Sequence, residues 1–168
     1  MLGLYENFPS TAHAIMKYIR LTSNRSLQQK LTETLHDLNT QTFSLEKVTD
    51  ASIPECLASF EFGIAEANDF NYLDDEEAHK VLKTVSRTPL QVMDFLCVVR
   101  YHRLRGGDKK TSLRFDYSLI RFVFSKDIME VQVFHERGPR HTSPEDIPNF
   151  IVNKVNEGSS KVALKEAV

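Results

Sequence analysis

The sequence predicts an α+β fold, in which a mostly antiparallel sheet of five or six strands carries about three packed helices. Two observations support this prediction. Residues 92–135 contain three apolar, β-rich runs separated by two turn signals, Gly106-Gly107-Asp108 and Lys126-Asp127, which is typical of an antiparallel meander. Stretches with helical spacing lie between the other strand candidates, as in sheets that have helices packed against them.

The pairing of the meander follows from matching apolar side chains across each turn. In the second hairpin, a two-residue turn pairs Phe124 with Met129, Phe122 with Val131 and Ile120 with Val133. In the first hairpin, placing Leu104 opposite Ser112 sets Tyr101 against Phe115, Val99 against Tyr117, Cys97 against Leu119 and Arg100 against Asp116. The two registers turn opposite faces of the middle strand to the core, so we expect a β-bulge or sharp twist near Leu119-Ile120. The alternative is a middle strand covered by helices on both faces.

The remaining elements are predicted from shorter patterns. Further strands are expected at residues 10–22, 41–49 and 56–65, and helices at 26–39, 74–86 and 147–157. Residues 10–22 fit a helical spacing about as well, but their β-branched and aromatic residues favour a strand. The first helix has a stripe of four leucines, and Ser26 with Gln29 forms a capping box at its start. Asp74 is a favourable N-cap for the second helix, and Gly158 ends the third.

Length and composition indicate one domain, residues 1–158, followed by a short tail at 159–168. Hydrophobic residues make up 41% of the chain, and no apolar run approaches the roughly 18 residues of a membrane span. The N-terminus lacks the pattern of a secretory signal, and the two cysteines, Cys56 and Cys97, occupy apolar strand positions. We therefore expect a soluble cytoplasmic protein with reduced thiols.

Charge is unevenly distributed, although the net charge of the chain is only −2. Residues 45–79 contain ten acidic residues and one lysine, whereas residues 80–141 contain thirteen lysines and arginines and six acidic residues. Such segregation can mark a partner surface. It is also expected if the acidic and basic parts face each other, inside one subunit or across a homodimer.

The densest polar chemistry combines arginine and histidine on the meander and on the turn that follows it. The candidate site residues are Arg100, His102, Arg114, His135, Arg137, Arg140 and His141. In the register above, Arg100, His102 and Arg114 share one face, with His102 opposite Arg114. Because Arg140 and His141 precede a helix start, the cluster can bind a phosphate or carboxylate. Alternatively, Glu136, Glu145 and Asp146, or the acidic segment 66–77, neutralise it.

These observations favour a non-enzymatic binding or assembly module, expected to be a homo-oligomer because exposed sheet edges need covering. The first alternative is an anion- or nucleic-acid-binding protein; against nucleic acid, Phe115, Tyr117 and Tyr101 are placed on the core side. The second is a small-ligand cavity under the sheet, lined by Phe60, Phe62, Phe95, Phe122 and Phe124, or a hydrolytic enzyme that pairs Glu61 or Glu66 with His102 or His135. No motif for a metal or cofactor is found, so neither is predicted.

Overall fold

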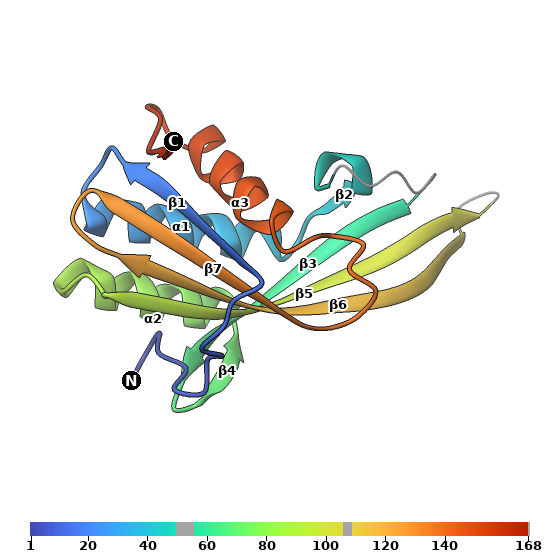
Figure 1. The fold of residues 1–168 in the computed structure, drawn as a ribbon, viewed down its shortest axis with the longest axis horizontal. Coiled ribbons are helices and arrows are strands. Elements are labelled where there is room, and N and C mark those ends of the chain that lie inside the picture. Colours follow the sequence, from blue (N-terminus) through green and yellow to red (C-terminus); the bar gives the residue numbers. More distant parts are fainter. Residues whose placement is uncertain (50–55, 106–108, 168) are drawn as a thin grey trace.

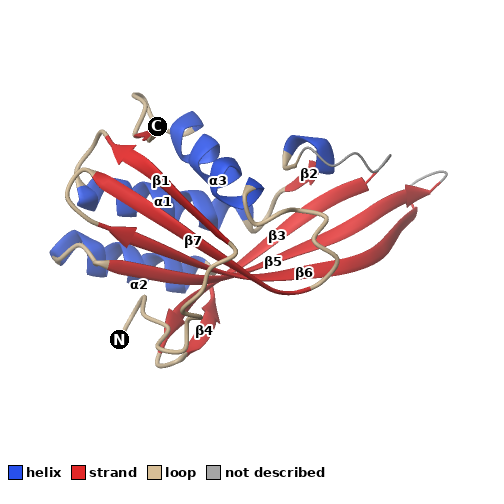
Figure 2. Cartoon of the chain, viewed as in Figure 1, coloured by secondary structure: helices blue, strands red, loops and turns tan. Residues whose placement is uncertain are grey.

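The computed structural model describes residues 1–49, 56–105 and 109–167, and only the backbone of residues 104, 105 and 109–113. It shows one long, curved antiparallel sheet with helices on one side (Figures 1 and 2). The strands are β1 (Ala14–Arg20), β2 (Thr42–Ser44), β3 (Cys56–Glu66), β4 (Asp69–Tyr72), β5 (Val92–Arg105), β6 (Lys109–Phe124), β7 (Ile128–Arg137) and β8 (Leu164–Glu166). The helices are α1 (Asn24–Leu38), α2 (Asp75–Arg87) and α3 (Asp146–Glu157), with a 3-10 turn, η1, at Leu45–Lys47.

The strand order is β2-β3-β5-β6-β7-β1-β8, and β4 pairs with the far end of β3. β1, the first strand in the sequence, therefore lies beyond the meander, between β7 and β8. At one end of the sheet β5 and β6 extend side by side, with β3 paired to β5 as far as Arg103 (Figure 1). We define the basic arm as residues 100–105 and 109–114.

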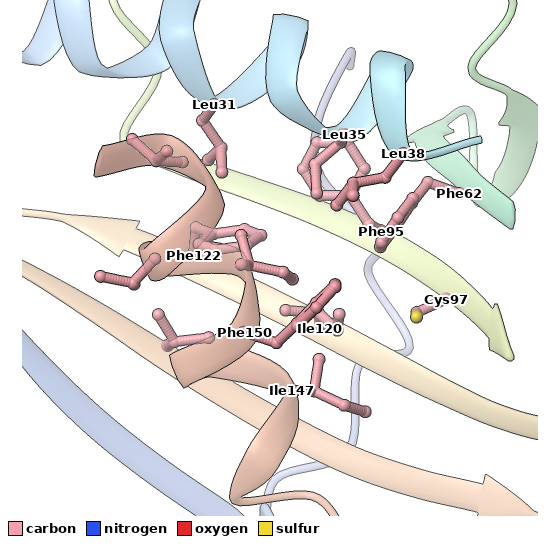
Figure 3. Close-up of a cluster of buried hydrophobic side chains, with 14 of the residues drawn as sticks. Leu31, Leu35, Leu38, Phe62, Phe95, Cys97, Ile120, Phe122, Ile147 and Phe150 are labelled. Carbon is pink, nitrogen blue, oxygen red and sulfur yellow. The ribbon is translucent and has the colours of Figure 1, made fainter. Parts of the chain in front are cut away.

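The core lies between the inner face of the sheet and the helices. Leu31 and Leu35 of α1 and Phe150 of α3 meet the inward-facing residues of the strands, including Phe95 and Phe122 (Figure 3). The phenylalanines pack against one another: Phe95 and Phe122 meet edge to face with centroids 5.7 Å apart. The five phenylalanines considered as a cavity lining are all buried in this cluster. α2 packs beside α1 and adds Val81 and Val85 to the same core.

The predicted α+β class, with an antiparallel sheet and three helices, is confirmed, but the sheet has eight strands rather than five or six. The two that were missed, β4 and β8, have only four and three residues. β4 follows a tight turn in which Ala67 and Asn68 both have positive φ. β8 lies within the predicted C-terminal tail, where Leu164 is buried and pairs with Arg20. Segments of three or four residues carry too little alternation to be recognised.

The ends of the helices differ from prediction by no more than two residues. The strand preferred for residues 10–22 is confirmed as β1. α1 starts earlier than the capping box implied, because Ser23 is the N-cap and accepts a hydrogen bond from the Ser26 N–H at 3.1 Å. The Asp74 N-cap of α2 is confirmed, as is Gly158 at the end of α3. The strand predicted at 41–49 shortens to β2 because the chain turns into η1.

The register of the second hairpin is confirmed, whereas that of the first is wrong by one residue. Phe124, Phe122 and Ile120 pair with Met129, Val131 and Val133 as expected. Asp116 pairs with Val99, Phe115 with Arg100, Tyr117 with Val98, Leu119 with Leu96 and Ser112 with His102. The inward phase of Ile120 and Phe122 therefore continues through Ser118 to Asp116, and both of these polar residues are buried. The turn signal at 106–108 lies outside the described residues.

Two bulges interrupt the pairing of β6, and one of them, at Tyr117-Ser118 on the β7 side, lies next to the predicted position near Leu119-Ile120. Between β5 and β6, the step from Arg100 to His102 faces the step from Phe115 to Ser112, so β6 carries one extra residue. Between β6 and β7, Tyr117 and Ser118 face Arg137 and His135, so Glu136 is the extra residue of β7. A bulge bends and twists its strand, and the second lies where β7 leaves the sheet.

Candidate functional site

A buried carboxylate, Asp116 in the middle of β6, organises the inner face beside the end of β7. Its Oδ1 accepts hydrogen bonds from His135 Nε2 at 2.9 Å and from the Arg140 N–H at 2.7 Å. Its Oδ2 accepts from the Tyr101 hydroxyl. The Asp116 side chain is 1% exposed, and Tyr101 and His135 are buried with it. Burying this carboxylate without hydrogen-bond donors would cost several kcal/mol. The donors therefore hold β5, β6 and β7 together around Asp116.

The hydrogen bonds assign the tautomer of His135. Its Nδ1 accepts from Arg140 Nε at 3.2 Å, so the ring proton is on Nε2, which donates to Asp116. His13 adds a further acceptor: its Nδ1 accepts from the His135 N–H at 2.9 Å. Both ring nitrogens of His135 are engaged within the protein. This arrangement favours a structural role for the Asp116–His135 pair, because a general base needs a free lone pair.

Tyr101 connects Asp116 to the segment that precedes α3. Its hydroxyl oxygen accepts from the Thr142 N–H at 2.9 Å and lies 2.8 Å from Thr142 Oγ1. Burial, and then the hydrogen bond to Asp116, raise the pKa of the Tyr101 hydroxyl well above its usual value. Tyr101 thus stays neutral and fixes residues 138–142 against the end of the sheet.

The backbone of this segment has a conformation that requires glycine. Gly138 has φ +116°, and a Cβ there would lie 2.3 Å from the Phe115 carbonyl oxygen and 2.5 Å from Asp116 Oδ1. Arg140 has φ 58°, which directs its N–H toward Asp116. The segment can therefore approach Asp116 only with glycine at 138.

The opposite, outer face of the same strands carries a different set of side chains. The guanidinium of Arg137 lies over the Tyr117 ring, with Cζ 4.0 Å from the centroid, and that of Arg100 lies over Phe115 at 5.1 Å. The Phe115 and Tyr117 rings are 6.1 Å apart along β6 and are only half-buried. We call these four residues the outer strip. Its arginines are held by stacking on rings rather than by burial.

The N-terminal segment covers another part of the outer face and leaves the strip beside it. Asp94 of β5, which is fully buried, forms a bidentate pair with Arg121, with both nitrogen–oxygen distances 2.8 Å. Asp94 also accepts from the Tyr5 N–H at 2.7 Å, and Arg121 lies over the Phe8 ring at 4.4 Å. These contacts hold residues 3–8 against the sheet.

The basic arm adjoins the outer strip and contains no acidic residue. Six of its twelve residues are basic: Arg100, Arg103, Arg105, Lys109, Lys110 and Arg114. The register places Arg105 directly opposite Lys109.

The structure divides the predicted site between the two faces. His135, Arg140 and His141 gather on the inner side, where His141 meets Tyr101 edge to face at 5.0 Å. Arg100 and Arg137 belong to the outer strip, because the extra residue Glu136 places His135 and Arg137 on opposite faces. Arg114 is exposed, and the prediction that it faces His102 is wrong because Ser112 occupies that position. The anion around which the inner residues gather is Asp116 of the chain itself.

Asp116, Tyr101, Thr142 and His13 were missed as members of this cluster. A signal for Asp116 existed: it is in phase with Ile120 and Phe122, four and six residues away on the same strand. The predicted register missed it because it placed the aromatic residues Phe115 and Tyr117, rather than Asp116, on the inner face. His13 and Thr142 carried no comparable signal, since they reach the cluster from segments far apart in the sequence.

The acidic segment is engaged away from the predicted site. Glu66 pairs with Lys80, and His36 Nε2 lies 2.7 Å from Asp75 Oδ1. Glu61, considered as part of an acid/base pair, lies 3.6 Å from Arg100 Nη2 on the outer face. Asp146 accepts from the Thr49 hydroxyl. Within the described residues, the ion pair of the 135–141 turn is the one between His135 and Asp116.

Comparisons with protein families, with curated proteins and with solved structures found no match for this chain. Within the described residues, no helix is long and apolar enough to cross a membrane. The same residues contain no group of three or more His, Cys, Asp or Glu side chains placed to hold a metal ion. Evidence on the function of this chain therefore comes from the geometry of its inner and outer faces.

Proposed function

We propose that the protein is a non-enzymatic binding module that binds a polyanionic partner through the outer strip and the basic arm. The observation that carries the proposal is the pair of arginines stacked on half-buried rings beside an arm with no acidic residue. Arginines held in this way lose little conformational freedom when they bind phosphate or carboxylate groups, which favours recognition of anions.

The donors of the outer strip are largely unused within the protein. Among the described residues, Arg137 forms no salt bridge, and the single ion pair of Arg100 is to Glu61 at 3.6 Å, with both side chains about half exposed. A surface pair of this kind contributes little and is easily exchanged. The outer strip can therefore offer guanidinium groups to an external anion. The His135 ring is not available in this way, because it is buried and hydrogen-bonded to both Asp116 and Arg140.

Binding to a heparin column tests the proposal, since heparin is a dense polyanion. We expect retention at about 50 mM salt and elution at clearly lower salt for Arg100→Gln and Arg137→Gln. Lys126→Gln, in the β6–β7 turn at the other end of the strands, is the matched control for loss of one positive charge. Flow-through of the unmodified protein, or an equal shift for Lys126→Gln, contradicts the proposal.

Self-association is a second candidate function, favoured by an open sheet edge. β8 pairs only with Tyr18, Ile19 and Arg20, so the rest of β1 extends beyond it. Ile15 in this part of β1 is 58% exposed. An uncovered edge with an exposed apolar side chain can pair with a second copy. Sedimentation velocity at low and high salt tests this candidate: a dimer that Ile15→Lys dissociates supports it, and a monomer throughout contradicts it.

A further inference from the structure

We infer that the polyanion is a single-stranded nucleic acid whose unpaired bases stack on the outer strip. This inference rests on the proposed function and adds the class of ligand. The distinguishing feature is the combination of ring faces and guanidinium planes, because a surface that recognised charge alone would need only the arginines.

The register gives the outer strip the arrangement that a single strand requires. Phe115 and Tyr117 are two positions apart on β6, so they lie on the same face. Arg100 comes from β5 on one side and Arg137 from β7 on the other. Neighbouring strands lie about 4.8 Å apart, so the four side chains cross roughly 10 Å of sheet. This width suits two or three adjacent bases with their phosphates.

Stacking also distinguishes a single strand from a duplex. In a duplex both faces of each base are covered by neighbouring bases, so a protein ring cannot reach them without unstacking the helix. In a single strand the bases are free to stack on aromatic rings or on guanidinium planes. In the observed register Phe115 and Tyr117 lie on the outer face, where a nucleic acid can reach them. The predicted register placed both rings in the core, which would have excluded this role.

The basic arm supplies the second component of such a site. Its residues adjoin the strip and include no acidic residue, and Arg114, next to Phe115 on β6, is exposed, so it can meet the phosphates of a strand stacked on the strip. Sites of this kind combine a basic path for the backbone with stacking platforms for bases, and their affinity depends strongly on salt. Beyond the rings, sequence preference is expected to be weak.

Fluorescence anisotropy with the whole protein tests the inference. The probes are labelled (dT)12 and (U)12, the matching 12-base-pair duplex and, as a competitor without bases, heparin. We expect both single strands to bind more tightly than the duplex, and a comparison of (dT)12 with (U)12 separates DNA from RNA preference. Tyr117→Leu should weaken single-strand binding about 5- to 100-fold, because the ring that holds the Arg137 guanidinium in place for stacking on a base is lost. Arg137→Gln should lower the slope of log affinity against log salt by roughly 0.7.

Two controls make the result decisive. Tyr72→Leu removes a tyrosine that is 52% exposed on β4, outside the strip, and should leave binding unchanged. Thermal unfolding of each variant checks that the fold is retained. Equal binding of single strand, duplex and heparin, with no effect of Tyr117→Leu, would overturn the inference while leaving polyanion binding intact. Absence of binding to every probe at low salt would instead overturn the proposed function itself.

Discussion

Neighbouring side chains of β6 point alternately to the inner and outer faces of the sheet, and the two faces differ in their chemistry. Asp116 points inward, is almost fully buried, and has every strong acceptor position used by His135, Arg140 and Tyr101. Its neighbours Phe115 and Tyr117 point outward and are half-buried under arginines. On the inner face the polar groups are hydrogen-bonded to one another. On the outer face the guanidinium groups of the arginines remain accessible to a binding partner. Substitutions on the two faces should therefore separate stability from binding.

The largest loss of stability is expected for Asp116→Ala. The substitution leaves the donors of His135, Arg140 and Tyr101 buried without their acceptor, which should lower the free energy of unfolding by about 3–5 kcal/mol. Chemical denaturation followed by circular dichroism measures the change. Glu136→Ala, an exposed carboxylate on the adjacent strand, should change stability by no more than about 0.5 kcal/mol. A similar effect for both variants would show that the Asp116 cluster is not what holds this end of the sheet.

The next largest effect is expected at Gly138. In Gly138→Ala the new Cβ meets the Phe115 carbonyl oxygen and the φ of +116° becomes strained, so we expect a loss of about 2–3 kcal/mol. Gly158→Ala is the matched control, because φ there is negative and the nearest atom is the end of the flexible Lys30 side chain at 3.2 Å. The control should change stability by less than about 1 kcal/mol. Equal denaturation midpoints for the two variants would contradict the close approach at Gly138.

Tyr101→Phe should have a smaller effect that depends on pH. At neutral pH the loss of the hydroxyl costs about 1–3 kcal/mol. In the native protein the pKa of Tyr101 is raised by burial and by Asp116, so its contribution is complete below about pH 10, the usual tyrosine value, and is lost as pH rises further. The variant should therefore lose stability less steeply above pH 10. Denaturation series from pH 7 to 11 measure both slopes, and parallel slopes would contradict the assignment.

The smallest stability effects are expected in the outer strip. Arg137→Gln removes one partly exposed cation–π contact, so the free energy of unfolding should fall by about 0.5–1 kcal/mol or less. The same variant should elute from heparin at lower salt, since we propose that the Arg137 charge contributes to polyanion binding. Thermal denaturation and elution salt, measured on one preparation, give both quantities. A large loss of stability with unchanged elution would reverse the roles assigned to the two faces.

The sequence predicted the fold well where apolar side chains set the register. Ile120, Phe122 and Phe124 fixed the second hairpin, and the leucines from Leu27 fixed α1, because burial of apolar area dominates at these positions. The first hairpin failed because its inward positions include the polar Asp116 and Ser118 while its outward positions are aromatic. There the buried hydrogen bonds decide which residue is inside, and they involve His13 and Thr142, which no local pattern connects to β6.

The candidate site was predicted as a set of residues but not as an arrangement. The sequence grouped the arginines and histidines of the 100–141 region into one candidate site, yet one extra residue in β7 separates His135 from Arg137. A bulge depends on how the strand leaves the sheet, and in this protein on the approach of Gly138 to Asp116. Neither feature can be read from the spacing of side chains.

The basic arm has a consequence for how the molecule would meet a partner. Positive charge is concentrated at one end of the sheet, whereas the acidic residues at the start of α2 lie elsewhere, so the protein has a permanent dipole moment despite its small net charge. In the electric field of a polyanion, a molecule with this dipole would rotate before contact, so that the basic arm would meet the partner first. The encounter rate should then fall with ionic strength even if the lifetime of the complex, set by the stacked rings, changes little.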